Sequence, residues 1–349
     1  MPRPARRRVV VAIAVPVEPE LVGTIRTTDD RLDVRYQPDL FPPLRYPGEH
    51  RGIDGFRRTQ DQETRWQRML YGAEVVLGLP DSVLADLVRT NPGLRWVQAT
   101  TGGVGEQVRS SGLTSEELER VRITGASCVH AVPLAEFAMF GVLAFAKQLP
   151  HLLVDARARR WDHHPMHELA GQTLLVIGLG SIGAEVAQLA KAFGMHVLAV
   201  NSTGRGEDPN VDEIRPPRFL GDLLPVAHAV VVALPSTPRT RGMIDDRLIR
   251  RMRLDAVLVN VGSGGVIDEQ ALVRGLERGA PAAAVLDVFE TEHLPADSPL
   301  WDLPNVLISP HTAASSAQEN ARIVALFTEN LRRYLRGDEL IGRVRPVVA

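Results

Sequence analysis

Two side chains that can exchange or stabilise a proton follow the last two apolar runs of the chain. Glu292 follows "AAVLDV", in "DVFETEH", and His311 follows "NVLISP" directly. Histidine is the side chain best matched to proton transfer near neutral pH. A carboxylate beside the ring would orient it and favour its protonated form. We therefore expect Glu292 and His311 to form an acid/base pair, the alternative being a capping histidine and an unrelated surface acid.

A glycine-rich turn supplies the second element of chemistry. The segment "VIGLGSIG" places Gly178, Gly180 and Gly183 in the spacing G-x-G-x-x-G, with Ser181 and Ile182 between them. The first glycine permits a tight turn, the second lets a pyrophosphate approach the backbone, and the third lets helix and strand pack closely. The free N–H groups at the helix start favour an anion. Because the pattern lies in a strand–turn–helix–strand unit, it predicts a dinucleotide site formed by these five residues.

The end of the next strand indicates which dinucleotide binds. NAD sites usually carry a carboxylate there for the ribose 2′-hydroxyl, but this strand ends in "LAVNSTGR", which places Asn201 at that position. Asn201 does not repel a 2′-phosphate, and Ser202, Thr203 and Arg205 are suited to contact one. We therefore expect NADP(H) to be preferred over NAD(H). The alternative is that Arg205 is a solvated loop residue and that either cofactor binds.

The elements that must position these residues alternate along the second half of the chain. Apolar runs such as "TLLVIG", "AVVVAL" and "AVLVN" are separated by segments such as "IGAEVAQLAKAF" and "DEQALVRGLERG". Runs that are apolar throughout and separated by helices indicate parallel strands covered on both faces. This pattern predicts an α/β protein with a Rossmann-type doubly wound parallel sheet of about six strands.

The first half predicts a second, smaller α/β domain, from the runs "VVVAIAV", "AEVVLGL", "LRWVQAT" and "VRITG". The prolines and glycines of residues 38–52 predict a long loop without regular structure, which is either a surface excursion or carries Arg45, His50 and Arg51 towards a cleft. The apolar stretch 132–150 predicts one helix bounded by prolines and buried between domains or against a partner chain. We expect a helix at 317–337 that returns to the first domain.

Composition limits the possible partners. The chain has 349 residues, long enough for two domains, with 40 basic and 42 acidic residues and a net charge of −2. This balance gives no basic surface for nucleic acid, and we expect no membrane span because no run approaches ~18 apolar residues. Cys128 is the only cysteine, which excludes intramolecular disulfides and suits the cytoplasm. The start "RRRVVVAIAV" is interpreted as a buried strand because Pro16 and Glu18 interrupt a signal-like pattern.

Five motifs in this order resemble the D-2-hydroxyacid dehydrogenase family: "VIGLGSIG", "LPSTPRTRGMID", "VLVNVGSGGVIDEQAL", "VLDVFETEHLPADSPLW" and "NVLISPHTA". The resemblance implies a coenzyme domain at residues 127–312 and a flavodoxin-like substrate domain made of residues 1–126 and 313–349. It also implies a homodimer that interconverts 2-oxo and 2-hydroxy acids with NAD(H) or NADP(H).

The resemblance assigns roles to individual residues. His311 is the acid/base and Glu292 its partner, and Leu234, Pro235, Val261, Gly262 and Asp287 join the cofactor site. The family's catalytic arginine stands in an N-x-x-R-G turn, but this chain has Ser263 there, between Gly262 and Gly264. Serine offers one neutral hydrogen bond where arginine offers a charged and often bidentate one.

The loop "TTGGVGE" resembles the family loop whose backbone N–H groups bind the substrate carboxylate, which implies a role for Gly102, Gly103 and Val104. The alternative for these glycines is a plain turn between a strand and a helix.

Two other groups of residues are given structural interpretations. We expect no metal at His163, His164 and His167, because Pro165 interrupts any helical face and a solvated loop accounts for them. We expect Cys128 and His130 to pack near the domain hinge rather than to form a nucleophile and base.

Two classes of function remain open at this point. The first is an oxidoreductase that acts on a small carbonyl or hydroxy compound, with or without the usual carboxylate. The second is a non-catalytic cofactor-binding or sensing protein that has lost the arginine. The presence of both Glu292 and His311 favours the enzyme, because a binding module needs neither.

Overall fold

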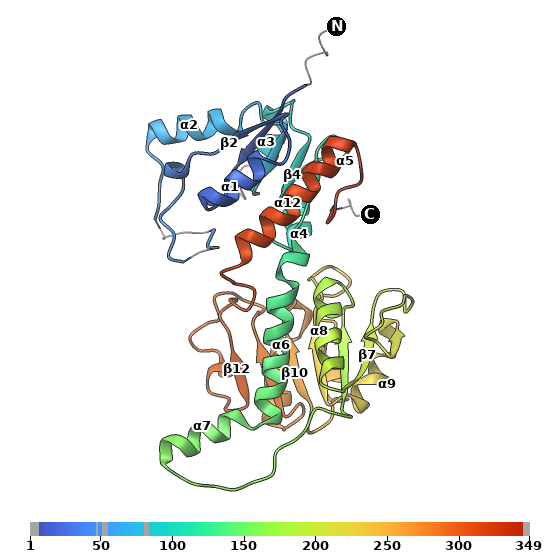
Figure 1. The fold of residues 1–349 in the computed structure, drawn as a ribbon. Helices are drawn as coiled ribbons and strands as arrows, with labels where there is room; N and C mark the ends of the chain where they lie inside the picture. Colours follow the sequence, from blue (N-terminus) through green and yellow to red (C-terminus); the bar gives the residue numbers. More distant parts are fainter. Residues whose placement is uncertain (1–6, 47, 51–54, 80–83, 345–349) are drawn as a thin grey trace. The chain divides into compact units, whose positions relative to one another are not determined.

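The computed structural model describes residues 7–46, 48–50, 55–79 and 84–344 of the chain. These residues form two compact units, the first within Met1–His130 and Ser315–Ala349 and the second comprising Ala131–Ala314 (Figure 1). Each unit contains one parallel sheet with helices on its faces, so the predicted α/β fold is confirmed.

The sheet of the first unit has the strand order β2-β1-β3-β4-β5, which is the flavodoxin-like order. Its strands are β1 (Val9–Ile13), β2 (Leu32–Arg35), β3 (Val75–Leu77), β4 (Trp96–Gln98) and β5 (Arg122–Thr124). Its helices are α1 (Pro19–Arg26), α2 (Gln60–Leu70), α3 (Leu84–Thr90), α4 (Val104–Ser110), α5 (Ser115–Arg120) and α12 (Glu319–Arg336). The helix α12 packs against α1, so the end of the chain belongs to the first unit.

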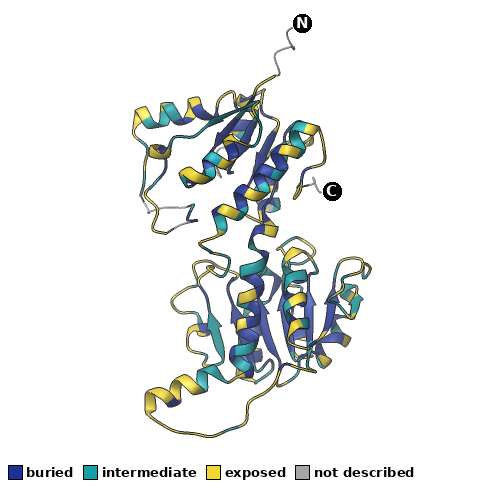
Figure 2. Cartoon of the chain, viewed as in Figure 1, coloured by how far each residue is buried: buried dark blue, intermediate teal, exposed yellow. Residues whose placement is uncertain are grey.

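Alternate side chains of these strands face opposite layers, as the period of a strand requires. Val11 of β1 packs with α1 and α12, whereas Ala12 packs with α2, α3 and α4. Figure 2 shows the inner strands of this unit buried beneath helices that expose their outer faces, whereas the edge strand β2 is half-buried. The core of the unit therefore consists of two apolar layers, one on each side of the sheet.

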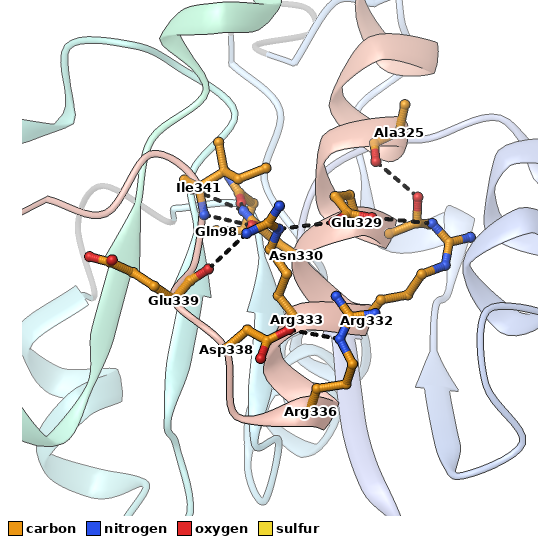
Figure 3. Close-up of polar contacts among 11 residues, drawn as sticks. Gln98, Ala325, Glu329, Asn330, Arg332, Arg333, Arg336, Asp338, Glu339 and Ile341 are labelled. Atoms are coloured by element: carbon orange, nitrogen blue, oxygen red, sulfur yellow. Dashed lines mark hydrogen bonds and ion pairs between the residues drawn. The ribbon is translucent and has the colours of Figure 1, made fainter.

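A buried amide joins α12 to the sheet and to the end of the chain. Asn330 donates from Nδ2 to Gln98 Oε1 (3.0 Å) and to the Ile341 carbonyl (3.0 Å), and it accepts from Ile341 N–H at 2.8 Å. The same Gln98 oxygen accepts from Thr124 Oγ1 at 2.8 Å. Figure 3 shows these contacts together with ion pairs along the outer face of α12. This network fixes the C-terminal helix on β4 and β5.

The sheet of the second unit has seven parallel strands in the order β12-β11-β10-β9-β6-β7-β8. The strands are β6 (Thr173–Ile177), β7 (His196–Val200), β8 (Glu213–Arg215), β9 (Ala229–Val232), β10 (Val257–Asn260), β11 (Ala283–Leu286) and β12 (Val306–Ile308). The helices are α6 (Ala131–Ala146), α7 (Leu149–Ala158), α8 (Ser181–Ala192), α9 (Leu220–Leu223), α10 (Asp246–Ile249) and α11 (Glu269–Glu277). This order is Rossmann-type with one added strand, β12.

Six of these strands coincide with predicted apolar runs, and β8 does not. The sequence "EIR" of β8 is short and polar, and its residues are half-buried or exposed because β8 pairs on one side only, with β7. The two faces of the sheet are again separated by strand period. Leu174 faces α6 and α8, whereas Leu175 faces α9, α10 and α11.

The apolar stretch 132–150 forms two helices rather than the single helix predicted. α6 ends at Ala146, Gln148 takes a left-handed conformation (φ 52°), and α7 begins at Leu149 with Pro150 in its first turn. Proline is favoured in the first turn, where its missing N–H has no helical partner, and is disfavoured inside a helix. The break therefore follows from Pro150, which starts the second helix instead of ending the first.

The apolar surface of α6 is buried inside the second unit, where it packs on α8, β10 and β11. Contrary to expectation, residues Ser127–Ala146 are long and apolar enough to cross a membrane by length and composition. Half of this stretch is buried inside the protein, and the core helix of a soluble protein meets the same criterion. Packing in the core therefore accounts for the composition of α6.

The predicted loop at 38–52 begins inside the core of the first unit. Pro38–Leu40 form a turn of 3₁₀ helix, and Leu40 and Phe41 are buried against α2. Farther along, Arg45 pairs with the buried Glu49, and His50 Nε2 lies 2.8 Å from Asn320 Oδ1 at the start of α12. These contacts tie both side chains to their own unit; Arg51 lies outside the described residues.

Candidate active site

The glycine turn after β6 has the shape that a pyrophosphate requires. Gly178 has φ +108°, and a Cβ there would lie 2.8 Å from the Ala233 carbonyl oxygen. A Cβ on Gly183 would lie 2.1 Å from the Gly178 oxygen, whereas one on Gly180 would meet no atom within 4 Å. α8 begins at Ser181, and no side chain caps its first N–H groups. Packing thus requires glycine at positions 178 and 183. Gly180 leaves open space in front of the free N–H groups of α8, so the turn fits the pyrophosphate of a dinucleotide.

This turn lies where the strand order reverses. β6 pairs with β7 on one side and with β9 on the other, and ligands of open α/β sheets bind at this switch point. Leu234 and Pro235 follow β9, and Thr240 Oγ1 donates to the Pro235 carbonyl at 2.6 Å, which closes their loop. A Cβ on Gly262, after β10, would lie 2.6 Å from Leu234 N. The predicted residues after β6, β9 and β10 therefore form one continuous edge.

Val261 has a different environment from its neighbours on this edge. It is buried in the core, and its N–H donates to the Val232 carbonyl at 3.1 Å. Its side chain therefore contributes packing at the end of β10, and its contact with a cofactor stays a prediction.

Asn201 shapes the loop after β7. Its Oδ1 accepts from the N–H groups of Thr203 (3.1 Å) and Gly204 (2.7 Å), and its Nδ2 donates to the Arg205 carbonyl at 2.8 Å. The amide is thus used within its own loop, while Ser202 and Arg205 are exposed. Among the described residues, Arg205 has no acidic partner. The loop therefore presents a free cation and hydroxyl groups where an NAD site carries a carboxylate.

His311 and Glu292 meet beyond neighbouring strands. Leu286 of β11 pairs with Ile308 of β12, so the segments that follow both strands emerge at the same edge. His311 Nδ1 lies 2.7 Å from Glu292 Oε2, and Glu292 Oε1 accepts from the Phe289 N–H at 3.2 Å. The His311 side chain is 55% exposed. With Nδ1 on the carboxylate, Nε2 is the ring atom left for a ligand.

A buried carboxylate that sequence reasoning assigned to the cofactor supports the His311 loop. Asp287 is 1% exposed, and its Oδ1 accepts from Ser309 Oγ (2.6 Å), Thr312 N–H (2.9 Å) and Ala313 N–H (3.0 Å). His311 lies inside this bridged segment with φ 56°, a left-handed conformation that is unfavourable for residues other than glycine. The surrounding hydrogen bonds must therefore hold His311 in this conformation.

A second acid holds the loop that carries Glu292. Glu269, at the start of α11, accepts from the Glu290 N–H at 3.1 Å. Burial raises the pKa of the Glu269 carboxyl, and the negative charge of nearby Glu290 adds to that effect. The loop is thus fixed from α11 as well as through Phe289.

The turn that carries Ser263 is shaped by Asn260, at the end of β10. Asn260 is 1% exposed; its Nδ2 donates to the Ser263 carbonyl at 3.2 Å and its Oδ1 accepts from the Gly262 N–H at 3.1 Å. A Cβ on Gly264 would lie 1.9 Å from the Phe289 carbonyl oxygen, so this glycine packs directly on the backbone before Glu292. The Ser263 side chain is partly exposed, and its hydroxyl has no hydrogen-bond partner among the described residues.

The glycines beside Ser263 do not provide empty space. Both Gly262 and Gly264 are packed against backbone, the first on Leu234 and the second on Phe289. They therefore make no room for a longer side chain at position 263, which would have to extend along the partly open side of residue 263 itself.

The predicted substrate loop belongs to the first unit. Gly102 and Gly103 lie between β4 and α4, and Val104 is the first residue of α4. A Cβ on Gly102 would lie 3.0 Å from Ser127 Cα, whereas one on Gly103 would meet nothing within 4 Å. In the described part of the chain, the N–H groups of all three residues donate no hydrogen bond. They are therefore available to an anion, and that role stays a prediction.

Cys128 and His130 do not form a reactive pair. Cys128 is exposed, contrary to the expectation that it packs. His130 Nε2 lies 3.1 Å from Glu319 Oε1, at the start of α12. His130 is thus tied to α12 rather than to the thiol.

Sequence reasoning missed the structural roles of Asn260 and Asp287. A signal existed for both, since each is a polar residue at the end of an otherwise apolar strand, in "VLVN" and "AAVLD". Such a residue is buried and needs partners. The sequence does not show which loops supply them.

Comparisons with known proteins agree with this geometry. Residues 139–313 match the model of the D-isomer specific 2-hydroxyacid dehydrogenase NAD binding domain. A glyoxylate reductase of Korarchaeum cryptofilum is 36% identical over 242 residues, which cover 65% of this chain and 72% of the relative. A D-3-phosphoglycerate dehydrogenase of Methanocaldococcus jannaschii is 33% identical over 239 residues, 64% of this chain, but the match spans only 45% of that longer protein.

A solved structure extends the likeness to both units. The D-isomer specific 2-hydroxyacid dehydrogenase of Xanthobacter autotrophicus, in complex with NADPH and MES, has a TM-score of 0.76 and 27% identity, covering 97% of this chain and 98% of its own. The chain therefore belongs to the D-isomer specific 2-hydroxyacid dehydrogenases, NAD(P)-dependent oxidoreductases that act on a CH–OH group.

Proposed function

We propose that this protein is a reductase of small 2-oxo acids that prefers NADPH and uses His311 as its acid/base residue. The observation that carries the proposal is the 2.7 Å contact between His311 Nδ1 and Glu292 Oε2 beyond the carboxyl ends of β11 and β12. Two similar proteins support the substrate class, because the relatives from Korarchaeum cryptofilum and Aeropyrum pernix are both glyoxylate reductases. A non-catalytic binding protein has no use for this pair.

Different residues of the second unit bind the cofactor and transfer the proton in this proposal. The turn from Gly178 to Gly183 and the start of α8 would hold the pyrophosphate. The bound cofactor supplies the hydride that a ketone needs to become an alcohol. His311 Nε2 donates the proton that the alkoxide oxygen takes up, and Glu292 stabilises the imidazolium before that transfer. In the reverse direction His311 accepts the hydroxyl proton.

The anchor for the substrate carboxylate is weakened in this proposal. Ser263 lies where the family pattern has arginine, so one neutral hydroxyl donor replaces a charged guanidinium that can donate two hydrogen bonds. Loss of one transition-state donor costs about 10²- to 10³-fold in rate. The N–H groups of Gly102, Gly103 and Val104 would then provide the remaining anchor. We infer that the enzyme either reduces ordinary 2-oxo acids more slowly than enzymes that retain the arginine, or acts on a substrate whose charge differs from that of a 2-oxo acid.

The preference for NADPH rests on the loop after β7. Arg205 is exposed and free of acidic partners in the described part of the chain, and Ser202 and Thr203 add hydroxyl groups beside it. The Xanthobacter autotrophicus neighbour was crystallised with NADPH. Fluorescence titration with both reduced cofactors tests this preference, and clearly tighter binding of NADH would contradict it.

We also propose a homodimer. Leu153 and Val154 on α7 are 49% and 55% exposed, and Trp161 is 98% exposed. Adjacent large apolar side chains of this kind are typical of an interface. A single-chain mass in sedimentation velocity would contradict the dimer.

The experiment that tests the function is a panel of 2-oxo acids, including glyoxylate, hydroxypyruvate and phenylpyruvate, assayed with NADPH and NADH. His311→Ala should lower kcat by about 10²-fold or more with cofactor affinity unchanged. Equal loss of turnover and cofactor binding would indicate a structural role for His311. A wild-type protein that binds NADPH tightly but turns over no member of the panel would favour the sensing alternative.

A further inference from the structure

Three polar side chains converge in the second unit at α7 and the segment that follows it, and none of them belongs to the candidate active site. His151 lies on α7, and Asp162 and His164 lie in the segment that follows this helix. His151 Nε2 is 3.3 Å from Asp162 Oδ2, and His164 Nδ1 is 3.8 Å from the same oxygen. One potential ligand atom from each residue lies within 4.8 Å of the other two.

The environment of His164 is unusual for a surface histidine. Its side chain is 17% exposed, and both of its ring nitrogens are shielded from solvent without a hydrogen-bond partner. Its ring packs edge-on against the ring of His151, with centroids 4.7 Å apart. A buried polar atom without a partner destabilises the folded protein. A ligand that engages this ring would remove that destabilisation.

Asp162 has no lysine or arginine as an ion-pair partner among the described residues. Asp155, four residues after His151 on α7, already pairs with Arg160 at 3.0 Å and lies 3.0 Å from His151 Nε2. Asp162, in contrast, has only the two histidines as ion-pair partners in the described part of the chain. A divalent cation would neutralise Asp162 and bind both rings.

We propose that His151, Asp162 and His164 bind a zinc-class divalent metal ion, with water as the fourth ligand. Two imidazoles and one carboxylate form a donor set that zinc prefers, with metal–ligand distances of about 2.0–2.2 Å. A tetrahedron of that size has edges of roughly 3.3–3.6 Å, close to the 3.3 and 3.8 Å observed. The third separation, between the ligand atoms of the two histidines, is within 4.8 Å, so the two rings would have to turn towards a shared metal ion.

The role that follows is structural. The metal would fasten the segment between α7 and β6, which is largely without regular structure, to α7 itself. Sequence reasoning considered a different set, His163, His164 and His167, and expected a solvated loop without a metal. His151 and Asp162 complete the cluster, while His163 and His167 remain exposed.

The test is direct metal binding by the full-length, tag-free protein in a Cys128→Ser background, because the exposed thiol is itself a zinc ligand. Protein stripped with a chelator is titrated with zinc by calorimetry, and Co²⁺ is added separately to record the visible absorption of a tetrahedral site. We expect one metal ion per chain. His164→Ala and Asp162→Asn should weaken binding by more than the ~10- to 100-fold typical of outer-shell changes.

His163→Ala is the matched control, since His163 is an exposed histidine in the same segment. It should bind zinc as the background protein does. Metal-free thermal unfolding of all variants separates loss of a ligand from loss of the fold, and the half-exposed Asp162 makes Asp162→Asn a mild change. The proposal is overturned if the background protein binds no stoichiometric metal, if His164→Ala binds equally well, or if His163→Ala weakens binding as much as His164→Ala.

Discussion

Replacing Asp287 by Asn tests whether this buried carboxylate positions His311. The side chain is 1% exposed, and three hydrogen bonds converge on its Oδ1 from Ser309, Thr312 and Ala313. Asn has nearly the same shape and retains an acceptor oxygen, but it removes the charge and places an amide NH₂ where Oδ2 lies. The variant therefore tests the charge-assisted part of the contact with little change in side-chain volume.

The expected cost follows from those three bonds. A hydrogen bond to a charged group contributes about 1.5–3 kcal/mol and a neutral one about 0.5–1.5, a difference of roughly 1 kcal/mol for each bond. Three bonds give an upper limit of about 3 kcal/mol for the loss of folding stability. The net loss is smaller because the variant no longer has a buried charge to desolvate. We expect a loss of about 1–3 kcal/mol in the free energy of unfolding, measured with urea.

Activity should fall although Asp287 does not reach the ligand in this interpretation. Weakening the bonds on either side of His311 lets its left-handed conformation relax, and a misplacement of about 1 Å can cost ~10²-fold in rate. We expect kcat on the best substrate of the panel to fall by about 10- to 100-fold, with the Kd for NADPH unchanged.

Ser309→Ala is the graded control, because it removes the 2.6 Å hydroxyl bond to Asp287 and the 3.2 Å contact with Thr312 Oγ1 but leaves the two backbone donors to Asp287 in place. Its effects on stability and kcat should be smaller than those of Asp287→Asn. If Asp287→Asn weakens NADPH binding while kcat at saturating cofactor is unchanged, Asp287 is a cofactor ligand. If stability and kcat both stay at wild-type values, the positioning argument is refuted.

Three further predictions concern the other loops of the site. Glu292→Gln removes the charged partner that orients the His311 ring, so kcat for reduction should fall by up to ~10²-fold with the Kd for NADPH unchanged; a wild-type kcat would show that Glu292 does not act on the ring. Ser263→Arg should raise kcat/KM for 2-oxo acids by about 10- to 100-fold, which corresponds to the free energy of a charged hydrogen bond. If the variant folds and binds cofactor but shows no gain, Ser263 does not occupy the position of the family's arginine in an otherwise intact site. Arg205→Ala should weaken NADPH binding by about 10- to 100-fold and leave NADH binding nearly unchanged, as a phosphate contact requires; equal effects on both cofactors would contradict that contact.

The sequence was sufficient where the physical constraint is local. The spacing of the glycines at 178, 180 and 183 is a local signature of a phosphate-binding turn, and the structure shows two of them packed and one open. Buried parallel strands are apolar on both faces, so six strands of the second sheet were readable as continuous runs. The edge strands β2 and β8 were not, because their half-exposed sequences "LDVR" and "EIR" carry no such pattern.

Only the tertiary structure decided which distant residues meet. The paired ends of β11 and β12 bring Asp287 to the segment around His311, and the local sequence of neither segment predicts this contact. The conformation of His311, with φ 56°, likewise depends on contacts made across the sheet edge. The same holds for His151 and His164, which a chain reversal after α7 places together. A sequence expresses the preferences of each segment, whereas burial and partner choice depend on distances that exist only after the strands have paired.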